Sequence, residues 1–376
     1  MKVVRTRKDN RTRFELRDES VAEGRLSGLS LVHLKMQIGS TVVRLGGIAG
    51  VSTPRPHRRK GYARMVMEDA RAFMAAKRWE MALLYGIRDF YPKFGYAVSM
   101  PGTWFSVRTR DAERAGLRHR VRKMKAADKK DILRIYRASN SGRTGVCVRD
   151  PRWWKPGRKG SRWHVSSLVK IFTDKRGKVA GYMMLDDDDE RTEVAEAGAA
   201  SRECYESILA TAARDAIEKR CGELTVWSPL DHPLFEVAGR FGARGTIRLN
   251  RSGGALARII DQQRLFETIA PELSLRACSA GLSKWRGAVT VRTELGESSL
   301  KLAGGRVSVA AGRARAKRMV SLELPQPALT QLVMGFRSAA DVLSTEGVAV
   351  EGDGAEEILA GLFPCGQPHM WQPDHF

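Results

Sequence analysis

The sequence predicts an α/β protein whose last third is an α+β region. Up to about residue 109, short apolar segments alternate with amphipathic helices, and the same order of elements recurs up to about residue 250. After the pair Gly253-Gly254, several short strands precede a group of helices. Strands that alternate with crossover helices indicate an α/β sheet, and strands followed by helices indicate an α+β unit. We therefore expect three domains, over residues 1–115, 116–254 and 255–376.

In the first domain, the segment Arg25–Ile38 is largely apolar on both faces, which predicts a strand that is covered on both sides. One helix is expected at 62–77, where Val66, Ala70 and Met74 recur at a spacing that forms a core-facing stripe. A basic linker is expected at 110–125. The remaining expected strands are 13–18, 41–53, 82–86 and 103–109.

The second domain repeats this order without a glycine-rich phosphate loop. Its segment Glu193–Arg202 stands where such a loop would be, but it is rich in alanine and glutamate and would repel phosphate. This copy is therefore interpreted as degenerate. The acidic run Asp186–Glu190 is expected to be a solvated turn and no metal site. Strands are expected at 121–124, 163–173, 178–185, 223–227 and 246–250, and helices at 128–136, 203–219 and 233–241.

The third domain is expected to open with a helix at 256–268. The short strands and turns that follow end in a tail with Trp371 and Phe376, which we expect to be docked, because an ordinary tail is polar and disordered. The expected strands are 288–293, 297–302, 306–310 and 320–324, and the expected later helices are 328–334, 339–343 and 355–362.

Composition restricts the class of the protein. The 376 residues carry a net charge of +23, which suggests a polyanionic partner or a phosphate-rich ligand. The five cysteines are scattered without a CxxC pair, which favours reduced thiols and a cytoplasmic protein. No apolar run approaches the ~18 residues of a membrane span, and no secretory signal follows the basic start.

The stretch Gly47–Phe73 predicts an anion-binding site. A short apolar strand leads into a loop with two prolines and four cations, and a helix begins close to Gly61. The first N–H groups of a helix lack partners and lie at the positive end of its dipole, so this position suits a phosphate or pyrophosphate. Gly61 and Ala63 would allow close approach, and Arg58 and Arg59 add positive charge. An ordinary basic turn that caps a helix is the alternative.

Two motifs carry a resemblance to a known family. The pattern Arg58-x-x-Gly61-x-Ala63 resembles the acyl-CoA signature of the GNAT acyltransferases, and the segment 84–97, LYGIRDFYPKFGYA, resembles their second motif in the right order and separation. The resemblance implies a sheet that splays beside the first motif and binds the pantetheine arm of acetyl-CoA along one strand edge. It places Tyr91 at the thioester sulfur. The implied contacts are Val51, Ser52 and Thr53 for the arm, and Arg58, Arg59, Lys60, Gly61, Tyr62 and Ala63 for the pyrophosphate.

The whole chain resembles the Eis (enhanced intracellular survival) branch of this family. There, an active GNAT domain, an inactive one and a sterol-carrier-like domain follow one another, and the chain ends in the active site. The resemblance implies direct acetyl transfer to a primary amine of a small molecule or peptide, with Tyr91 as acid and the terminal carboxylate of Phe376 as base. It also implies a homo-oligomer, a hexamer. A tyrosine that only packs and an inert docked terminus are the alternatives.

The N-terminus departs from the family pattern. A GNAT domain opens with a strand and two helices that wall the acceptor site, but only about 25 residues precede the long hairpin here. A more open pocket, a subunit interface that fills the gap, and a misassigned start codon all remain as explanations. The strong positive charge argues against polycationic aminoglycosides as the native acceptor. It also supports a rival reading, a non-catalytic protein that binds polyanions or nucleic acid on a GNAT scaffold. A sterol or acyl carrier is a third reading.

Overall fold

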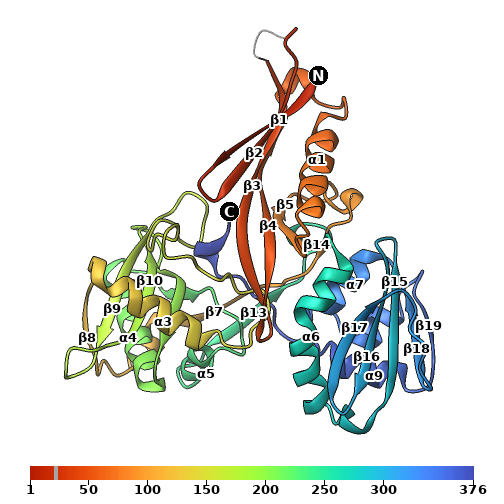
Figure 1. Ribbon diagram of the computed structural model, residues 1–376. Coiled ribbons are helices and arrows are strands. Elements are labelled where there is room, and N and C mark those ends of the chain that lie inside the picture. The colour runs from red at the N-terminus through yellow and green to blue at the C-terminus, as the bar shows by residue number, and fades with distance from the viewer. Residues whose placement is uncertain (21–23) are drawn as a thin grey trace. The chain divides into compact units, whose positions relative to one another are not determined.

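The computed structural model describes residues 1–20 and 24–376, which form two seven-stranded sheets and one five-stranded sheet (Figure 1). The chain divides into two compact units. The first contains residues 1–100, 250–368 and 376, and the second contains residues 101–249 and 369–375. The chain therefore passes from the first unit to the second after residue 100 and returns after residue 249, whereas the sequence suggested boundaries at 115 and 254.

The first sheet has the strand order β1-β2-β3-β4-β5-β14-β6. Neighbouring strands are antiparallel except β4 and β5, which are parallel. The strands β3, β4 and β5 lie where the sequence predicts them, within one residue at each end. The strands are β1 (Lys2–Lys8), β2 (Arg11–Arg17), β3 (Arg25–Ile38), β4 (Thr41–Ser52), β5 (Met81–Gly86), β6 (Ala97–Val98) and β14 (Gly254–Ile259).

The helix expected at 256–268 is wrong in its first half. Residues 254–259 are strand β14, which pairs with β5 on one side and β6 on the other. Leu256 and Ala257 are both fully buried, as in a strand that is covered on both faces, and such a short apolar run does not distinguish strand from helix. The helix α6 (Gln262–Ser279) starts after Asp261, whose carboxylate accepts a hydrogen bond from the Arg264 N–H at 2.8 Å.

Residues 2–17 form a hairpin and no helix. The strand expected at 13–18 is confirmed as β2, and β1, which the sequence did not suggest, pairs with it along its whole length. Phe14 and Leu16 are fully buried, and the Phe14 ring makes an edge contact with Phe73 at 5.5 Å between ring centroids. The hairpin therefore belongs to the core of the first unit.

The helix α1 (Tyr62–Ala76) packs against the first sheet (Figure 1) through the apolar stripe that the sequence predicted. Val66, Met67, Ala70 and Met74 are buried on this side. The helix α6 contacts β4 and also strand β17 of the five-stranded sheet. The first unit thus contains both sheets joined through α6.

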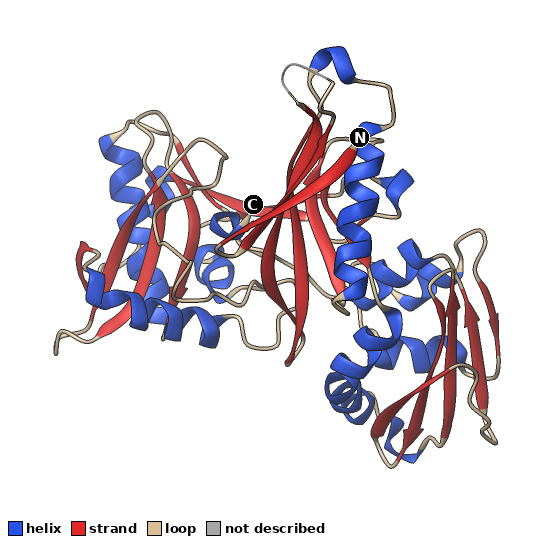
Figure 2. Ribbon diagram, turned by 45° about the horizontal axis from the view of Figure 1, so that its top comes forward, coloured by secondary structure: helices blue, strands red, loops and turns tan. Residues whose placement is uncertain are grey.

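The five-stranded sheet has the order β17-β16-β15-β18-β19, with helices gathered on one face (Figure 2). All four strands predicted here are confirmed within one residue at each end, and a short strand β19 is added. The elements are β15 (Gly287–Thr293), β16 (Gly296–Ala303), β17 (Arg306–Ala311), β18 (Met319–Glu323), β19 (Ala349–Glu351), α7 (Gln326–Val333), α8 (Ala339–Leu343) and α9 (Ala355–Leu362).

The second unit is one sheet with helices on both faces. Successive residues of a strand point to opposite faces, so Ile171, Tyr182 and Met184 pack with α3, whereas Phe172 and Met183 pack with α4. The strand order is β13-β7-β12-β11-β10-β9-β8. The elements are β7 (Gly102–Arg108), α2 (Thr109–Ala112), β8 (Arg120–Lys123), α3 (Lys129–Ser139), β9 (Ser167–Thr173), β10 (Val179–Asp186), β11 (Glu193–Ala199), α4 (Arg202–Glu218), β12 (Glu223–Val226), α5 (Pro233–Gly239) and β13 (Arg244–Arg248).

Three expectations for this part of the chain need correction. Residues 110–125 are no linker, because α2 and β8 belong to the second unit and the side chains of Thr109 and Ala112 are buried. Residues 193–199, which were expected to stand where a loop would be, are strand β11. Asp186 is fully buried and accepts a hydrogen bond from the Ser161 N–H at 2.9 Å, so the solvated acidic turn begins only after it.

We predict that Phe14→Ala lowers the free energy of unfolding of the first unit by about 3–5 kcal/mol, because it removes a fully buried ring. Val42→Ala, on the neighbouring sheet surface with 43 % exposure, is the control and should cost less than about 1 kcal/mol. Urea denaturation followed by circular dichroism measures both. Equal effects would show that the hairpin does not belong to the core.

Candidate active site

The site is built where β4 and β5 part. The two strands pair from Leu45–Met81 to Ile48–Leu84, and among the described residues this pairing goes no further. On its other edge β4 stays paired with β3 as far as Ser52. The segment 49–52 therefore presents an open strand edge toward β5, and such an edge can accept an extended ligand through its N–H and C=O groups.

The loop after β4 leads directly into the start of α1. The Arg58 guanidinium turns back and donates from Nε to the Thr53 carbonyl at 3.2 Å. Gly61 precedes the helix with φ of +79°, in the left-handed region that favours glycine. A Cβ at this position would meet nothing within 4 Å, so its backbone conformation, and not crowding, requires the glycine. The first N–H groups of α1 have no acceptor within the helix and lie at its positive end.

One pocket of about 580 Å³ joins the open edge and the helix start. It contains every predicted cofactor residue except Lys60, and it contains Tyr91. The further lining residues come mainly from the second motif, segment 84–97, which contains η2 (Pro92–Phe94). The sequence did not name them as site residues, although this motif could have identified them. The lining residues are Val51, Ser52, Thr53, His57, Arg58, Arg59, Gly61, Tyr62, Ala63, Arg64, Ile87, Phe90, Tyr91, Lys93 and Phe94.

Tyr91 lies at the β5 side of this pocket. Its ring makes an edge contact with Phe90 at 4.9 Å and packs on Gly86, where an added Cβ would overlap the ring. Burial raises the pKa of the Tyr91 phenol above its ordinary value. The tyrosine therefore keeps its proton at neutral pH and can act as a proton donor.

Phe376 lies against β4, within the same unit. Its side chain is buried, its ring centroid is 5.8 Å from that of Tyr85, and a Cβ added to Gly47 would come within 2.8 Å of its ring. Phe376 is not among the residues that line the pocket. Gly47 is four positions before Val51 on the strand whose end forms the open edge. The tail is docked, as expected, since Met370 and Trp371 are also buried.

The described residues contain no group of three or more histidine, cysteine or acidic side chains that could hold a metal ion. Within the same residues, no helix has both the length and the apolar character needed to cross a membrane. The five cysteines are free thiols.

Residues 8–99 match the family of acetyltransferase (GNAT) domains. This segment contains β2 to β5, α1, the whole pocket and Tyr91. The first part of the chain is therefore a GNAT acetyltransferase domain, and the protein is an enzyme of the acetyltransferase class.

The fold of nearly the whole chain is similar to that of solved structures. A conserved protein from Enterococcus faecalis V583, described as a probable N-acyltransferase, is 17% identical with a TM-score of 0.75, covering 98% of this chain and 90% of that one. A GCN5-related N-acetyltransferase from Anabaena variabilis has 16% identity, coverages of 98% and 90%, and a TM-score of 0.74. Eis1 from Mycobacterium abscessus has 16% identity, coverages of 97% and 90%, and a TM-score of 0.66. No curated protein sequence matches. These likenesses establish the fold.

We predict that Tyr91 ionises only above the ordinary tyrosine pKa of about 10. Burial disfavours the phenolate, so the proton is retained as the pH rises and is lost only at more alkaline pH. The difference in tyrosinate absorbance between the wild type and Tyr91→Phe, followed from about pH 8 to about pH 12, measures this ionisation. A tyrosinate signal from Tyr91 below about pH 9 would contradict the prediction that burial raises the pKa of this phenol.

Proposed function

We propose that the protein is an acetyl-CoA-dependent N-acetyltransferase that transfers the acetyl group directly to a primary amine of a small molecule or peptide. The observation that carries this proposal is the single pocket that contains the open edge of β4, the start of α1 and Tyr91. Each of these three elements suits a different part of the same cosubstrate.

The residues fit coenzyme A. The backbone groups of Val51, Ser52 and Thr53 suit the two amides of a pantetheine arm, as an added strand would. The first N–H groups of α1, with Arg58 and Arg59, suit the diphosphate. Ile87, which is 70% exposed, offers apolar surface beside the arm. When bound, acetyl-CoA supplies an acetyl group as a thioester, with an electrophilic carbonyl carbon and a thiolate as leaving group.

Two groups of the chain are proposed to move protons. The Tyr91 phenol donates its proton to the departing sulfur, and its raised pKa keeps the proton in place until negative charge develops there. The terminal carboxylate of Phe376 accepts the proton that the amine loses as the N–C bond forms and the C–S bond breaks. A backbone N–H near Val51 is proposed to polarise the carbonyl oxygen. The chain therefore ends the reaction with one proton gained at the terminus and one given by the tyrosine.

The remaining assignments rest on the resemblance to the Eis branch. They are a degenerate second GNAT domain at residues 116–254, a sterol-carrier-like region at 255–376, a cytoplasmic location and a homo-oligomer, a hexamer. The fold shared with Eis1 supports the first two. The resemblance implies a tail that reaches the active site, and the buried Phe376 against Gly47 supports that arrangement here.

The decisive experiment combines the purified protein with acetyl-CoA and a panel of primary amines that includes small molecules and short peptides. The release of free thiol should depend on the amine, and mass spectrometry should show one added acetyl group on the product. No turnover with any amine, together with salt-sensitive binding to DNA, would instead support the polyanion-binding alternative that the net charge of +23 suggests.

We predict that Tyr91→Phe lowers kcat by about 100-fold and changes the Kd for coenzyme A by less than about 3-fold, since the ring is kept and only the proton donor is lost. Tyr96→Phe is the matched control, because Tyr96 is buried 6.4 Å from Tyr91 between ring centroids and does not line the pocket. Steady-state kinetics and calorimetry measure the two constants. A kcat within about 3-fold of the wild type would exclude Tyr91 as the acid.

We predict that deletion of Phe376 lowers kcat by at least about 100-fold while the Kd for coenzyme A is kept, because the terminal carboxylate moves back by one residue. Adding one glycine after Phe376 keeps the ring and also moves the carboxylate, so it should lower kcat similarly. Phe376→Leu keeps the carboxylate and tests the ring alone. Unchanged turnover in both the deleted and the extended chain would refute the terminus as base.

A further inference from the structure

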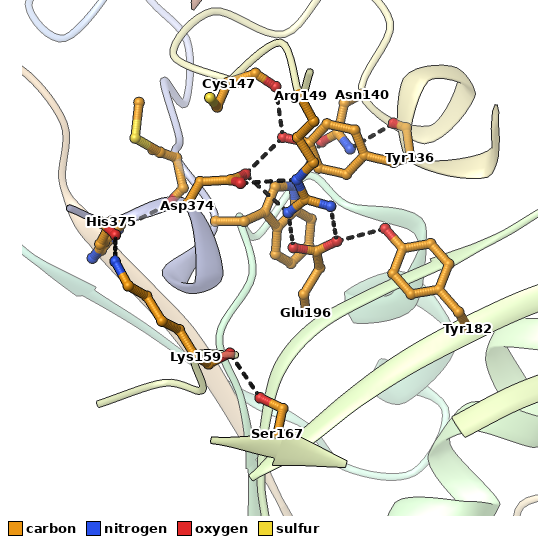
Figure 3. Close-up of polar contacts among 12 residues, drawn as sticks. Tyr136, Asn140, Cys147, Arg149, Lys159, Ser167, Tyr182, Glu196, Asp374 and His375 are labelled. Carbon is orange, nitrogen blue, oxygen red and sulfur yellow. Dashed lines mark hydrogen bonds and ion pairs between the residues drawn. The ribbon is translucent and has the colours of Figure 1, made fainter. Parts of the chain in front are cut away.

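A buried cluster of charges in the second unit holds the tail of the chain, residues 369–376, close to its end (Figure 3). The Arg149 guanidinium donates to Glu196 through both terminal nitrogens, at 2.7 Å for the pair Nη1–Oε1. The same guanidinium donates to Asp374 from Nε at 2.8 Å and from Nη2 at 2.9 Å. At most 3% of any of the three side chains is exposed. We call Arg149, Glu196 and Asp374 the Arg149 cluster.

Two tyrosines complete the hydrogen bonds of the Arg149 cluster. The Tyr136 hydroxyl donates to Asp374 at 2.9 Å, and the Tyr182 hydroxyl donates to Glu196 at 2.6 Å (Figure 3). The central carbon of the guanidinium lies over the Tyr136 ring, 3.7 Å from its centroid. The charged groups are therefore paired, hydrogen-bonded and stacked, which a buried ion needs in order not to destabilise the fold.

The rest of the tail is held in the same unit. Trp371 is fully buried, and its indole N–H donates to the Asn140 side chain at 2.8 Å. The backbone N–H of His369 donates to the Thr144 carbonyl at 3.0 Å, and the Lys159 ammonium donates to the His375 carbonyl. Burial lowers the pKa of the His375 imidazole to about 3, so this side chain is neutral beside the terminus.

Stability alone does not account for a charged cluster at this place. Buried ion pairs contribute little net stability compared with apolar residues of similar size, whereas they fix one arrangement, because every other arrangement leaves a buried charge unpaired. The planar guanidinium also fixes the orientation of both carboxylates, because it donates hydrogen bonds to them only along its two donor edges. Asp374 is two residues before Phe376, so fixing its carboxylate leaves only two residues of freedom before the chain ends.

We propose that Arg149 and Glu196 are positioning residues that hold Asp374 and thereby restrain the terminal residue Phe376. The restraint acts through the two peptide bonds between Asp374 and Phe376. Its consequence for catalysis rests on the proposed function, in which the carboxylate of Phe376 accepts the proton of the amine. Trp371 anchors the middle of the tail, and the Arg149 cluster sets where the last two residues begin.

The first test reads the position of the terminus without using catalysis. Asp374→Asn is nearly isosteric and removes the charge that Arg149 holds, and Asp187→Asn, at an exposed acid of the same unit, is the matched control. Carboxypeptidase A should release Phe376 from Asp374→Asn at least about 10-fold faster than from the wild type and the control, with circular dichroism and Tm showing that all three are folded. Equal release rates in the three folded proteins would overturn the proposal. If Asp374→Asn does not fold, Arg149→Lys takes its place, because it keeps the charge but loses the two donor edges.

The second test asks whether the Arg149 cluster acts on turnover through Phe376. In the full chain, Asp374→Asn should lower kcat by about 10-fold with the Kd for coenzyme A unchanged. In a chain that lacks Phe376, the same substitution should change kcat by less than about 2-fold, because the group that it positions is gone. Equal losses in both backgrounds would show a general structural role and overturn the proposal. A wild type with no turnover but with a Phe376 that Asp374→Asn exposes to carboxypeptidase would refute the proposed function and still support the positioning.

Discussion

The candidate site depends on the place where two parallel strands stop pairing. As long as β4 and β5 are bonded to each other, as at Ile48 and Leu84, neither edge is available to a ligand. Beyond that pair, β4 keeps its bonds to β3 and β5 keeps its bonds to β14, so each strand stays ordered while one edge of β4 is exposed. A ligand that binds like an added strand needs a rigid strand whose backbone N–H and C=O groups are unused along one edge.

Glycines on these two strands make room for the aromatic groups proposed to act in catalysis. Gly86 at the end of β5 receives the ring of Tyr91, and Gly47 in β4 receives the ring of Phe376. Any larger residue at either position would push the ring away. The parting of the strands and the small residues beside it therefore leave room for the Tyr91 and Phe376 rings on neighbouring strands, as the proposed site requires.

The tail shows how a short segment with only one 3-10 turn, Gln372–Asp374, can be ordered largely by its side chains. It has few backbone bonds, and its order comes from one buried indole and from the buried charge of Asp374 on Arg149. The Arg149 cluster has no excess of positive charge, because its one guanidinium is paired with two carboxylates. The net charge of +23 is therefore a property of other regions, and it does not by itself indicate the function of the protein.

The sequence by itself determined what depends on neighbours along the chain. The basic loop at Arg58–Ala63, the helix start close to Gly61, the stripe of α1 and the turn that carries Tyr91 all follow from local spacing, and most strands were placed within two residues. Only the tertiary structure decided which distant segments meet. Residues 254–259 became a strand because β5 and β6 cover both of its edges, although their apolar pattern also suits a helix. Glu196, which the sequence suggested would repel phosphate, is instead paired with Arg149, and that pairing depends on an ion partner 47 positions away in the sequence.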